Sequence, residues 1–259
     1  MKSTHFPEPF VAVGCSGCRN PHELGFDFTM AFQPIVDMQL RRPYAYEALV
    51  RGVNGEGAGS ILAKVNDDNR YRFDQACRVK AIELASRLGL HKLPDCKLSI
   101  NFMPGAVYRP ETCIRATLEA SREFDFPTDR LMFEVTEGER VADPQHLVGI
   151  FQEYRRQGFT TAIDDFGSGY SGLNLLATFQ PQVLKLDMEL TRDICNHSVR
   201  QAIVAGVLLV AEKLGITVIA EGVETQSECD CLVRMGVRYI QGYLFAKPAL
   251  EQLQTDLFN

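Results

Sequence analysis

Residues 160–187 read TTAIDDFGSGYSGLNLLATFQPQVLKLD, and this segment sets the pattern for the rest of the chain. Two short β-rich runs, Thr160–Ile163 and Val183–Leu186, flank a glycine-rich loop and a segment that predicts a helix. Strand, helix and strand in this order favour parallel pairing of the two strands through a crossover. Acidic residues follow both strands, Asp164 and Asp165 after the first and Asp187 after the second.

The same alternation extends in both directions along the chain. Eight β-rich apolar runs are present: Phe28–Val36, Tyr44–Val50, Lys97–Phe102, Leu131–Val135, Thr160–Ile163, Val183–Leu186, Thr217–Ala220 and Tyr239–Leu244. Longer helical patterns lie between them, as in Arg70–Leu88, Pro144–Gln157 and Arg200–Leu214. Eight strands alternating with helices in roughly 230 residues predict an α/β fold, a modified TIM-like (β/α)8 barrel.

The start of the chain departs from this alternation. The first two runs are joined only by Asp37–Pro43, which is too short for a crossover helix. We therefore expect one antiparallel strand in an otherwise parallel barrel. No repeat or low-complexity linker divides the chain, so we predict an N-terminal extension over residues 1–27 and one domain over residues 28–259.

Composition excludes several classes of partner. The formal net charge is −6 and no basic run is present, so we expect no DNA or RNA polymer as a ligand. No apolar stretch approaches the roughly 20 residues that span a bilayer, and the first ten residues lack an apolar signal core. The expectation is a cytoplasmic protein without a membrane segment. The eight cysteines are read mainly as free buried thiols.

Polar residues recur at the ends of the predicted strands. They are Glu47, Asn101, Glu134, Glu137, Asp164, Asp165, Lys185, Asp187, Glu221 and Gln241. In a parallel barrel the C-terminal strand ends meet on one face, where catalytic groups lie. So many carboxylates would repel one another unless cations were present. Oxygen ligands without a convergent set of histidines or cysteines suit Mg²⁺ or Mn²⁺.

Taken one at a time, these acids have a simpler interpretation than a shared metal site. A single Asp or Glu is more often a solvated charge, a helix cap or one partner of a surface ion pair. Recurrence on seven strands favours a shared site instead. The adjacent Asp164 and Asp165 are suited to serve two ions, and paired metals about 3.5–4 Å apart promote phosphodiester cleavage.

The loop Asp165-Phe-Gly-Ser-Gly-Tyr-Ser171 contains two partial motifs of other families. Asp-Phe-Gly is also found in protein kinases, but the chain has no His-Arg-Asp catalytic loop and no Val-Ala-Ile-Lys strand. The glycines lack the Gly-Lys-Ser/Thr ending of a phosphate-binding P-loop. The loop therefore indicates neither class of nucleotide-binding protein.

Taken together, the motifs resemble those of the EAL-domain family between about Phe28 and Pro248. They are Phe32-Gln-Pro-Ile, Tyr46-Glu-Ala-Leu-Val-Arg51, Phe133-Glu-Val-Thr-Glu137, Asp164-Asp-Phe-Gly-Ser-Gly-Tyr-Ser171, Leu184-Lys-Leu-Asp187, Ala220-Glu-Gly-Val-Glu224 and Gln241-Gly-Tyr-Leu-Phe. The resemblance implies a cyclic di-GMP phosphodiesterase. Such an enzyme uses Mg²⁺ or Mn²⁺ at a two-metal site to hydrolyse this bacterial second messenger to linear pGpG.

The resemblance also assigns roles to individual residues. It implies that the metals are held by Glu47, Asn101, Glu134, Asp164, Asp165 and Asp187, with catalytic roles for Lys185, Glu221 and Gln241. It implies ligand contacts from Gln33 and Arg51. Glu137 resembles the residue that anchors the loop 165–171, through which catalysis and dimerisation are coupled, so a homodimer is expected. One departure is Met103, where the family usually has a small hydroxyl residue two places after the Asn.

Two other functions are compatible with parts of this pattern. A catalytically weak or inactive receptor would bind cyclic di-GMP and signal through a partner protein, typically after losing metal ligands that this chain keeps. A different metal-dependent barrel enzyme would share only the acids at the strand ends. A regulatory protein partner, a dimer interface or the N-terminal segment would have to carry any control signal.

Cys15 and Cys18 form a Cys-x-x-Cys pair in the N-terminal extension. Such a pair binds zinc or cycles as a disulfide in many proteins. A second pair at zinc-finger spacing is absent, and Cys229-Asp-Cys231 has the wrong spacing. An unligated segment is therefore the simpler interpretation, and a small zinc or redox site is the alternative hypothesis.

Overall fold

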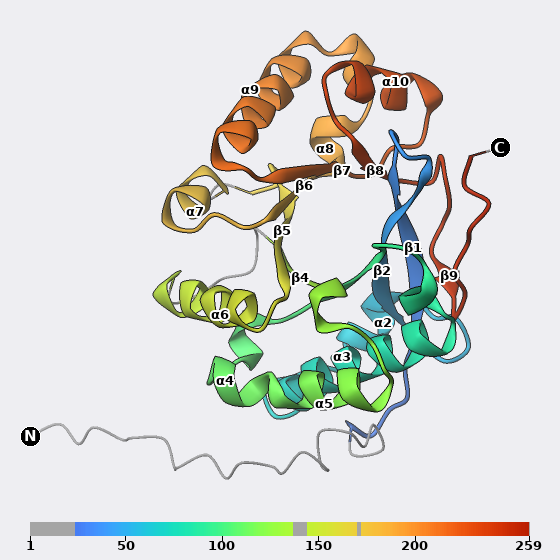
Figure 1. The fold of residues 1–259 in the computed structure, drawn as a ribbon, viewed down its shortest axis with the longest axis vertical. Helices are drawn as coiled ribbons and strands as arrows, with labels where there is room; N and C mark the ends of the chain where they lie inside the picture. Colours follow the sequence, from blue (N-terminus) through green and yellow to red (C-terminus); the bar gives the residue numbers. More distant parts are fainter. Residues whose placement is uncertain (1–23, 137–143, 170–171, 259) are drawn as a thin grey trace, which may run out of the picture.

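The computed structural model describes residues 24–136, 144–169 and 172–258 (Figure 1). Its strands are β1 (Thr29–Asp37), β2 (Arg42–Arg51), β3 (Lys97–Asn101), β4 (Leu131–Thr136), β5 (Thr160–Phe166), β6 (Val183–Leu186), β7 (Thr217–Ala220), β8 (Tyr239–Gln241) and β9 (Ala249–Leu250). Its helices are α2 (Ala58–Leu62), α3 (Arg70–Arg87), α4 (Pro110–Cys113), α5 (Arg115–Glu123), α6 (Pro144–Arg156), α7 (Gly172–Thr178), α8 (Met188–Thr191), α9 (Ser198–Leu214) and α10 (Gln226–Arg234). Short 3₁₀ turns are η2 (Leu90–Lys92), η3 (Pro104–Ala106), η4 (Thr128–Arg130) and η5 (Ile194–Asn196).

Eight of the strands close into a barrel. The sheet runs from β2 through β8 with parallel neighbours, and β1 closes it between β8 and β2. Strand β1 is antiparallel to both of these neighbours, because the short 37–43 connection reverses the chain at once. The predicted barrel with one antiparallel strand is confirmed. The boundaries predicted for the N-terminal extension and the single domain remain predictions.

The end of the barrel differs from the prediction in one detail. The last expected strand was Tyr239–Leu244, but β8 ends at Gln241. A Cβ at Gly242 would lie only 1.9 Å from the carbonyl oxygen of Val223. The two backbone segments can approach this closely only because residue 242 is glycine. The chain then returns as β9, which pairs antiparallel with Ala31 and Phe32 of β1.

A layer of apolar side chains fills part of the barrel interior. We call it the apolar layer, and its buried members are Ile35, Ala45, Met132, Ala162, Val183 and Ile219. Each comes from a different strand, as expected for the packed interior of a barrel of this type. Because strand side chains alternate in direction, the residues two positions away also point into the barrel.

A buried ion pair lies outside the barrel wall, between α3 and the segment after β3. The Arg78 guanidinium bonds to Asp74 at 2.8 Å and donates to the Tyr154 hydroxyl at 2.6 Å. The other carboxylate oxygen of Asp74 accepts the backbone N–H of Met103 at 2.9 Å. This contact holds the backbone directly after Asn101, the last residue of β3. No helix in the described ranges is both long and apolar enough to cross a membrane.

Candidate metal centre and active site

A second layer of interior side chains lies two residues beyond the apolar layer, and it is polar. We call it the polar layer; its members are Gln33, Glu47, Glu134, Asp164, Lys185, Glu221 and Gln241. Strand alternation places Glu47 two residues after Ala45, and Lys185 two residues after Val183. Gln33 precedes Ile35 because β1 runs in the opposite direction. The polar layer therefore gathers at the C-terminal ends of the parallel strands.

Lys185 lies at the centre of the polar layer with no solvent-exposed surface. Its ammonium nitrogen contacts four carboxylates: Glu221 at 2.7 Å, Glu134 at 2.9 Å, Asp164 at 3.0 Å and Glu47 at 3.3 Å. Burial disfavours the charged ammonium, but these carboxylates, Asp164 foremost, outweigh burial and raise the pKa of Lys185. One cation thus stabilises four acids that come from four different strands.

The single positive charge of Lys185 does not offset the burial and mutual repulsion of the carboxylates. Burial, opposed by Lys185 and reinforced by Glu47, raises the pKa of Glu134 to about 8. Burial and the nearby Asp164 raise the pKa of Glu221 well above its ordinary range. The Ser99 hydroxyl, two residues before Asn101 on β3, donates a hydrogen bond to Glu134. Ser99 was missed in the sequence, although strand alternation from Asn101 points to it.

Asp164 and Asp165 face the same cavity although they are neighbours in the chain. Successive strand residues normally point to opposite faces, but the pairing of β5 with β6 is irregular between Ile163 and Phe166. Asp165 takes a left-handed backbone with φ of 54°, which Asp tolerates better than most residues. Its N–H donates to Asp164 Oδ1 at 3.0 Å. Burial, followed by repulsion from Asp164, raises the pKa of Asp165 to about 6.

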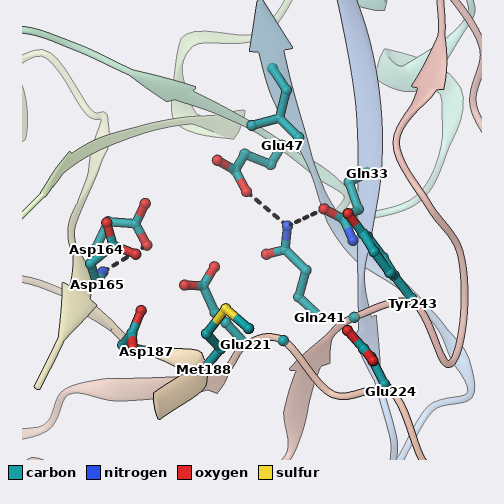
Figure 2. A pocket seen from close by; sticks show the side chains of 13 residues that line it. Gln33, Glu47, Asp164, Asp165, Asp187, Met188, Glu221, Glu224, Gln241 and Tyr243 are labelled. Atoms are coloured by element: carbon teal, nitrogen blue, oxygen red, sulfur yellow. Dashed lines mark hydrogen bonds between the residues drawn. The ribbon is translucent and has the colours of Figure 1, made fainter. Parts of the chain in front are cut away.

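Two side-chain amides donate hydrogen bonds to Glu47, and Figure 2 shows one of them, Gln241, between Glu47 and Gln33. The Gln241 amide nitrogen donates to Glu47 at 2.7 Å and to Gln33 at 3.3 Å, and the Asn101 amide donates to Glu47 at 2.8 Å. Gln33 in turn donates to the Ala246 carbonyl at 3.2 Å. The carbonyl oxygen of the Gln241 side chain is buried and has no hydrogen-bond partner within the described part of the chain. An orphaned acceptor at this position calls for a donor such as water.

Asp187 has a structural role in addition to its place in the site. It is the N-cap of α8, and its carboxylate accepts the backbone N–H of Glu189 at 2.7 Å. It also lines the cavity, so the structure brings it together with the predicted ligands.

An open cavity of about 380 Å³ lies above the polar layer. It is lined by Gln33, Glu47, Leu49, Asp164, Asp165, Asp187, Met188, Glu221, Gly222, Glu224, Gln241, Gly242 and Tyr243. Figure 2 shows the carboxylates of Glu47, Asp164 and Glu221 pointing toward its centre from different strands. Gly222 has a φ of 66°, and a Cβ there would lie 2.3 Å from Met188 Cβ. The sequence did not single out Met188, Glu224 or Tyr243 as cavity residues.

The acids of the cavity, together with the fully buried Glu134 that does not line it, fit a pair of divalent cations. Two groups of carboxylate oxygens each lie within 4.8 Å of one another: Glu47, Glu134 and Asp164 form one, and Asp164, Asp165 and Glu221 the other. Asp164 belongs to both. When ionised, these five carboxylates and Lys185 carry a formal charge of −4, which two divalent cations cancel. The donor set is all oxygen, as hard cations require.

An apolar cavity of about 370 Å³ adjoins the acidic one, and both are lined by Leu49. Its lining includes Asn101, Phe102, Met103 and Val50. Arg51 follows Val50 at the end of β2 and donates to the Val50 carbonyl at 2.7 Å, but it does not line the acidic cavity. Glu137, Cys15 and Cys18 lie outside the described residues, so their predicted roles stay predictions.

Comparison with known proteins adds family information to this geometry. The family model of the EAL domain matches residues 23–248. A standalone EAL protein from Vibrio cholerae, in its c-di-GMP-bound form, is 55% identical, with a TM-score of 0.85 over 88% of this chain and 95% of that one. Klebsiella pneumoniae BlrP1 in a manganese and cyclic di-GMP complex is 37% identical, with a TM-score of 0.83 over 92% of this chain and 59% of that one.

Among curated relatives, the cyclic di-GMP phosphodiesterase PdeR of Escherichia coli is 36% identical over 138 residues, which are 53% of this chain and 21% of that protein. The chain spans about half the length, or less, of the curated relatives that it matches.

Proposed function

The chain belongs to the EAL-domain family, and from this premise we propose that it is a metal-dependent phosphodiesterase that hydrolyses cyclic di-GMP to linear pGpG. The observation that carries the proposal is the meeting of the buried Lys185 with two carboxylate groups that share Asp164, four of whose five acids line one cavity. Since its proposed substrate is an intracellular messenger, we propose the cytoplasm as the place of action.

Several residues would hold two Mg²⁺ or Mn²⁺ ions. Glu47, Glu134 and Asp164 would hold one, with Asn101 beside Glu47; Asp164, Asp165 and Glu221 would hold the other. Asp187 lines the same cavity and would complete or orient this set. Bound divalent ions supply Lewis acidity and lower the pKa of a coordinated water.

The remaining polar residues would act on the water and the phosphate. Among the described residues, the only charged partners of the Lys185 ammonium are the four carboxylates. Where those carboxylate oxygens bind metal ions instead, the N–H groups of Lys185 would be free to donate to the attacking water or to the phosphate. Gln241 would orient the water through its unpartnered carbonyl oxygen. Gln33 accepts a hydrogen bond from the Gln241 amide nitrogen and would thereby keep the Gln241 carbonyl oxygen turned toward that water.

The two adjoining cavities suit the two chemical parts of a dinucleotide. A phosphodiester would lie over the acids, and a purine would enter the apolar cavity beside Asn101 and Phe102. Arg51 is the last residue of β2, and Leu49, two residues before it, lines both cavities. A guanidinium at this position suits two parallel hydrogen bonds to the oxygens of one phosphate.

The test is incubation of the purified chain with cyclic di-GMP and Mn²⁺, with chromatography for pGpG. The proposal predicts pGpG that EDTA suppresses and excess Mn²⁺ restores. Binding of cyclic di-GMP by calorimetry, without any pGpG in the presence of Mn²⁺ or Mg²⁺, would instead establish the receptor alternative.

We also propose a homodimer through α9. Its exposed side chains Val199, Ile203, Val210 and Leu214 are 70%, 47%, 37% and 44% exposed and recur at helical spacing. The spacing is symmetric about residues 206 and 207, so an antiparallel second copy would pair Val199 with Leu214 and Ile203 with Val210. Such self-complementarity is what a two-fold interface requires.

Light scattering on size-exclusion chromatography tests the dimer. Ile203→Asp should give a monomer, whereas Leu209→Asp, on another side of the same helix, should leave the dimer intact. A wild-type monomer at micromolar concentration would overturn the interface.

A further inference from the structure

Two cysteines meet at the junction between η5 and α10, away from the acidic cavity. Cys195 lies in η5, and its thiol donates to the carbonyl of Ser227 at 2.9 Å. Ser227 is one helical turn before Cys231 on α10. Helical side chains lean back over the preceding turn, so the Cys231 thiol lies on the turn of α10 that Cys195 approaches. Burial first, and then the nearby Cys195 thiol, raises the pKa of Cys231. Both thiols belong to the apolar cluster packed between these elements.

The surroundings of the pair favour thiol chemistry over metal binding. Groups of three or more metal-ligating side chains among the described residues occur only in the acidic cavity, so this pair has no third ligand. Cys195 is partly exposed and gives solvent access, while Cys231 is 6% exposed. Burial raises the pKa of the Cys231 thiol and Arg234 opposes this only in part, so the partly exposed Cys195 is the thiol that meets an oxidant first.

The junction is tied to two loops of the active site. The buried Glu228 carboxylate accepts the N–H of Asp193 at 2.8 Å on one side, and those of Glu224 and Thr225 at 3.0 Å on the other. The Thr191 hydroxyl donates to the carbonyl of Glu221 at 2.5 Å. The η5 segment is therefore linked to the loop that bears Glu221, and it follows α8, which Asp187 caps.

We propose that Cys195 and Cys231 are a reversible dithiol–disulfide site that is oxidised by hydroperoxides and that slows turnover at the acidic cavity. The Cys195 thiol loses its proton, and the thiolate attacks the peroxide O–O bond to give a sulfenic acid; the displaced oxygen takes up the proton and leaves as an alcohol or water. The second thiolate displaces water from the sulfenic sulfur, and the S–S bond forms. Two thiols are oxidised, and one peroxide is reduced.

Bond formation would move the junction. A disulfide is about 2.05 Å long, well over 1 Å shorter than the closest approach of two sulfur atoms that are not bonded to each other. Closing that gap draws η5 toward α10 and shifts the loops that bear Asp187 and Glu221. A displacement of this size in a catalytic group costs on the order of tenfold or more in rate. This regulatory part rests on the proposed phosphodiesterase function, whereas disulfide formation does not.

The test is treatment of the reduced full chain with hydrogen peroxide, alkylation of the remaining thiols and tryptic digestion without reductant. Cys195 lies in the peptide Asp193–Arg200, and Cys229 and Cys231 lie together in Leu214–Arg234. The expected product joins these peptides with the loss of two hydrogens. Cys231→Ser should abolish the link, and Cys229→Ser, the matched control on the same helix, should retain it.

Two further readouts complete the test. Oxidation should raise the melting temperature by on the order of 5 °C and lower pGpG formation about tenfold, both reversed by dithiothreitol and both absent in Cys231→Ser. Absence of the link while other thiols are oxidised overturns the site. A link without any change in turnover of an active enzyme overturns the regulation alone. A chain that makes no pGpG even when reduced counts against the phosphodiesterase, and the peptide map still decides the disulfide.

Discussion

The apolar and polar layers of the barrel interior come from the same strands, two residues apart, yet they differ in almost every property. Ala45, Ala162 and Val183 pack in the apolar layer, whereas Glu47, Asp164 and Lys185 follow them on the same strands. One layer is stabilised by close contact and needs no charge. The other holds acids whose mutual repulsion is only partly offset by one lysine.

The difference separates stability from chemistry within one barrel. Substitutions in the apolar layer should remove packing energy and leave the acids in place. Substitutions in the polar layer should remove function and in some cases relieve repulsion.

The largest effect is expected for Asp164→Asn in the polar layer. Asp164 belongs to both carboxylate groups, so its loss should lower the rate of pGpG formation on the order of a thousandfold even at saturating Mn²⁺. The metal-free variant should melt at the wild-type temperature or above it, because one repelling carboxylate is gone. Activity within tenfold of wild type would remove Asp164 from the site.

Lys185→Met should show that the lysine stabilises the metal-free polar layer. The change leaves four buried carboxylates without their cation, so the free energy of unfolding in EDTA should fall by about 3 kcal/mol. Mn²⁺ should raise the stability of the variant more than that of wild type. Urea unfolding with and without Mn²⁺ measures both, and equal stability in EDTA would contradict the role of Lys185.

Ile219→Ala in the apolar layer is the complementary test. Ile219 is fully buried two residues before Glu221, and its truncation should cost about 3 kcal/mol of unfolding free energy. The rate of pGpG formation per folded molecule should stay within about twofold of wild type. A much larger loss of rate at full folding would show that the two layers are not separable.

Metal affinity should rise with pH, and this pH dependence tests the raised pKa values of the acids at the site. The pKa of Glu134 is raised to about 8 and that of Asp165 to about 6, so a cation must displace a proton from Glu134 across this range and from Asp165 only near pH 6. Between pH 6 and 8 the apparent affinity for Mg²⁺ should increase up to about tenfold per pH unit for each proton released. Calorimetry in two buffers of different ionisation enthalpy measures the protons, and pH-independent binding without proton release would contradict these shifts.

Strand positions and the acids at strand ends could be predicted because both depend on local pattern. The barrel, the antiparallel first strand and the convergence of Glu47, Glu134, Asp164 and Glu221 follow from strand order and alternation. The shared orientation of Asp164 and Asp165 depends on a strand irregularity that no local pattern shows.

Contacts between distant segments were also missed. Strand β9 forms only because β1 has a free edge beyond β8. The approach of Cys195 to the turn of α10 that bears Cys231 depends on how η5 packs on α10, and the sequence indicated only separate buried thiols.

The most direct test of the two-ion polar layer combines metal counting with product formation. Mn²⁺ bound per chain is measured for wild type and for Asp164→Asn with cyclic di-GMP present, and pGpG is quantified in the same samples. Wild type should bind two ions and convert cyclic di-GMP completely to pGpG, whereas the variant should bind fewer ions and form almost no pGpG. Full conversion by a wild-type chain that binds no divalent cation, or two bound ions with no pGpG, would contradict this prediction.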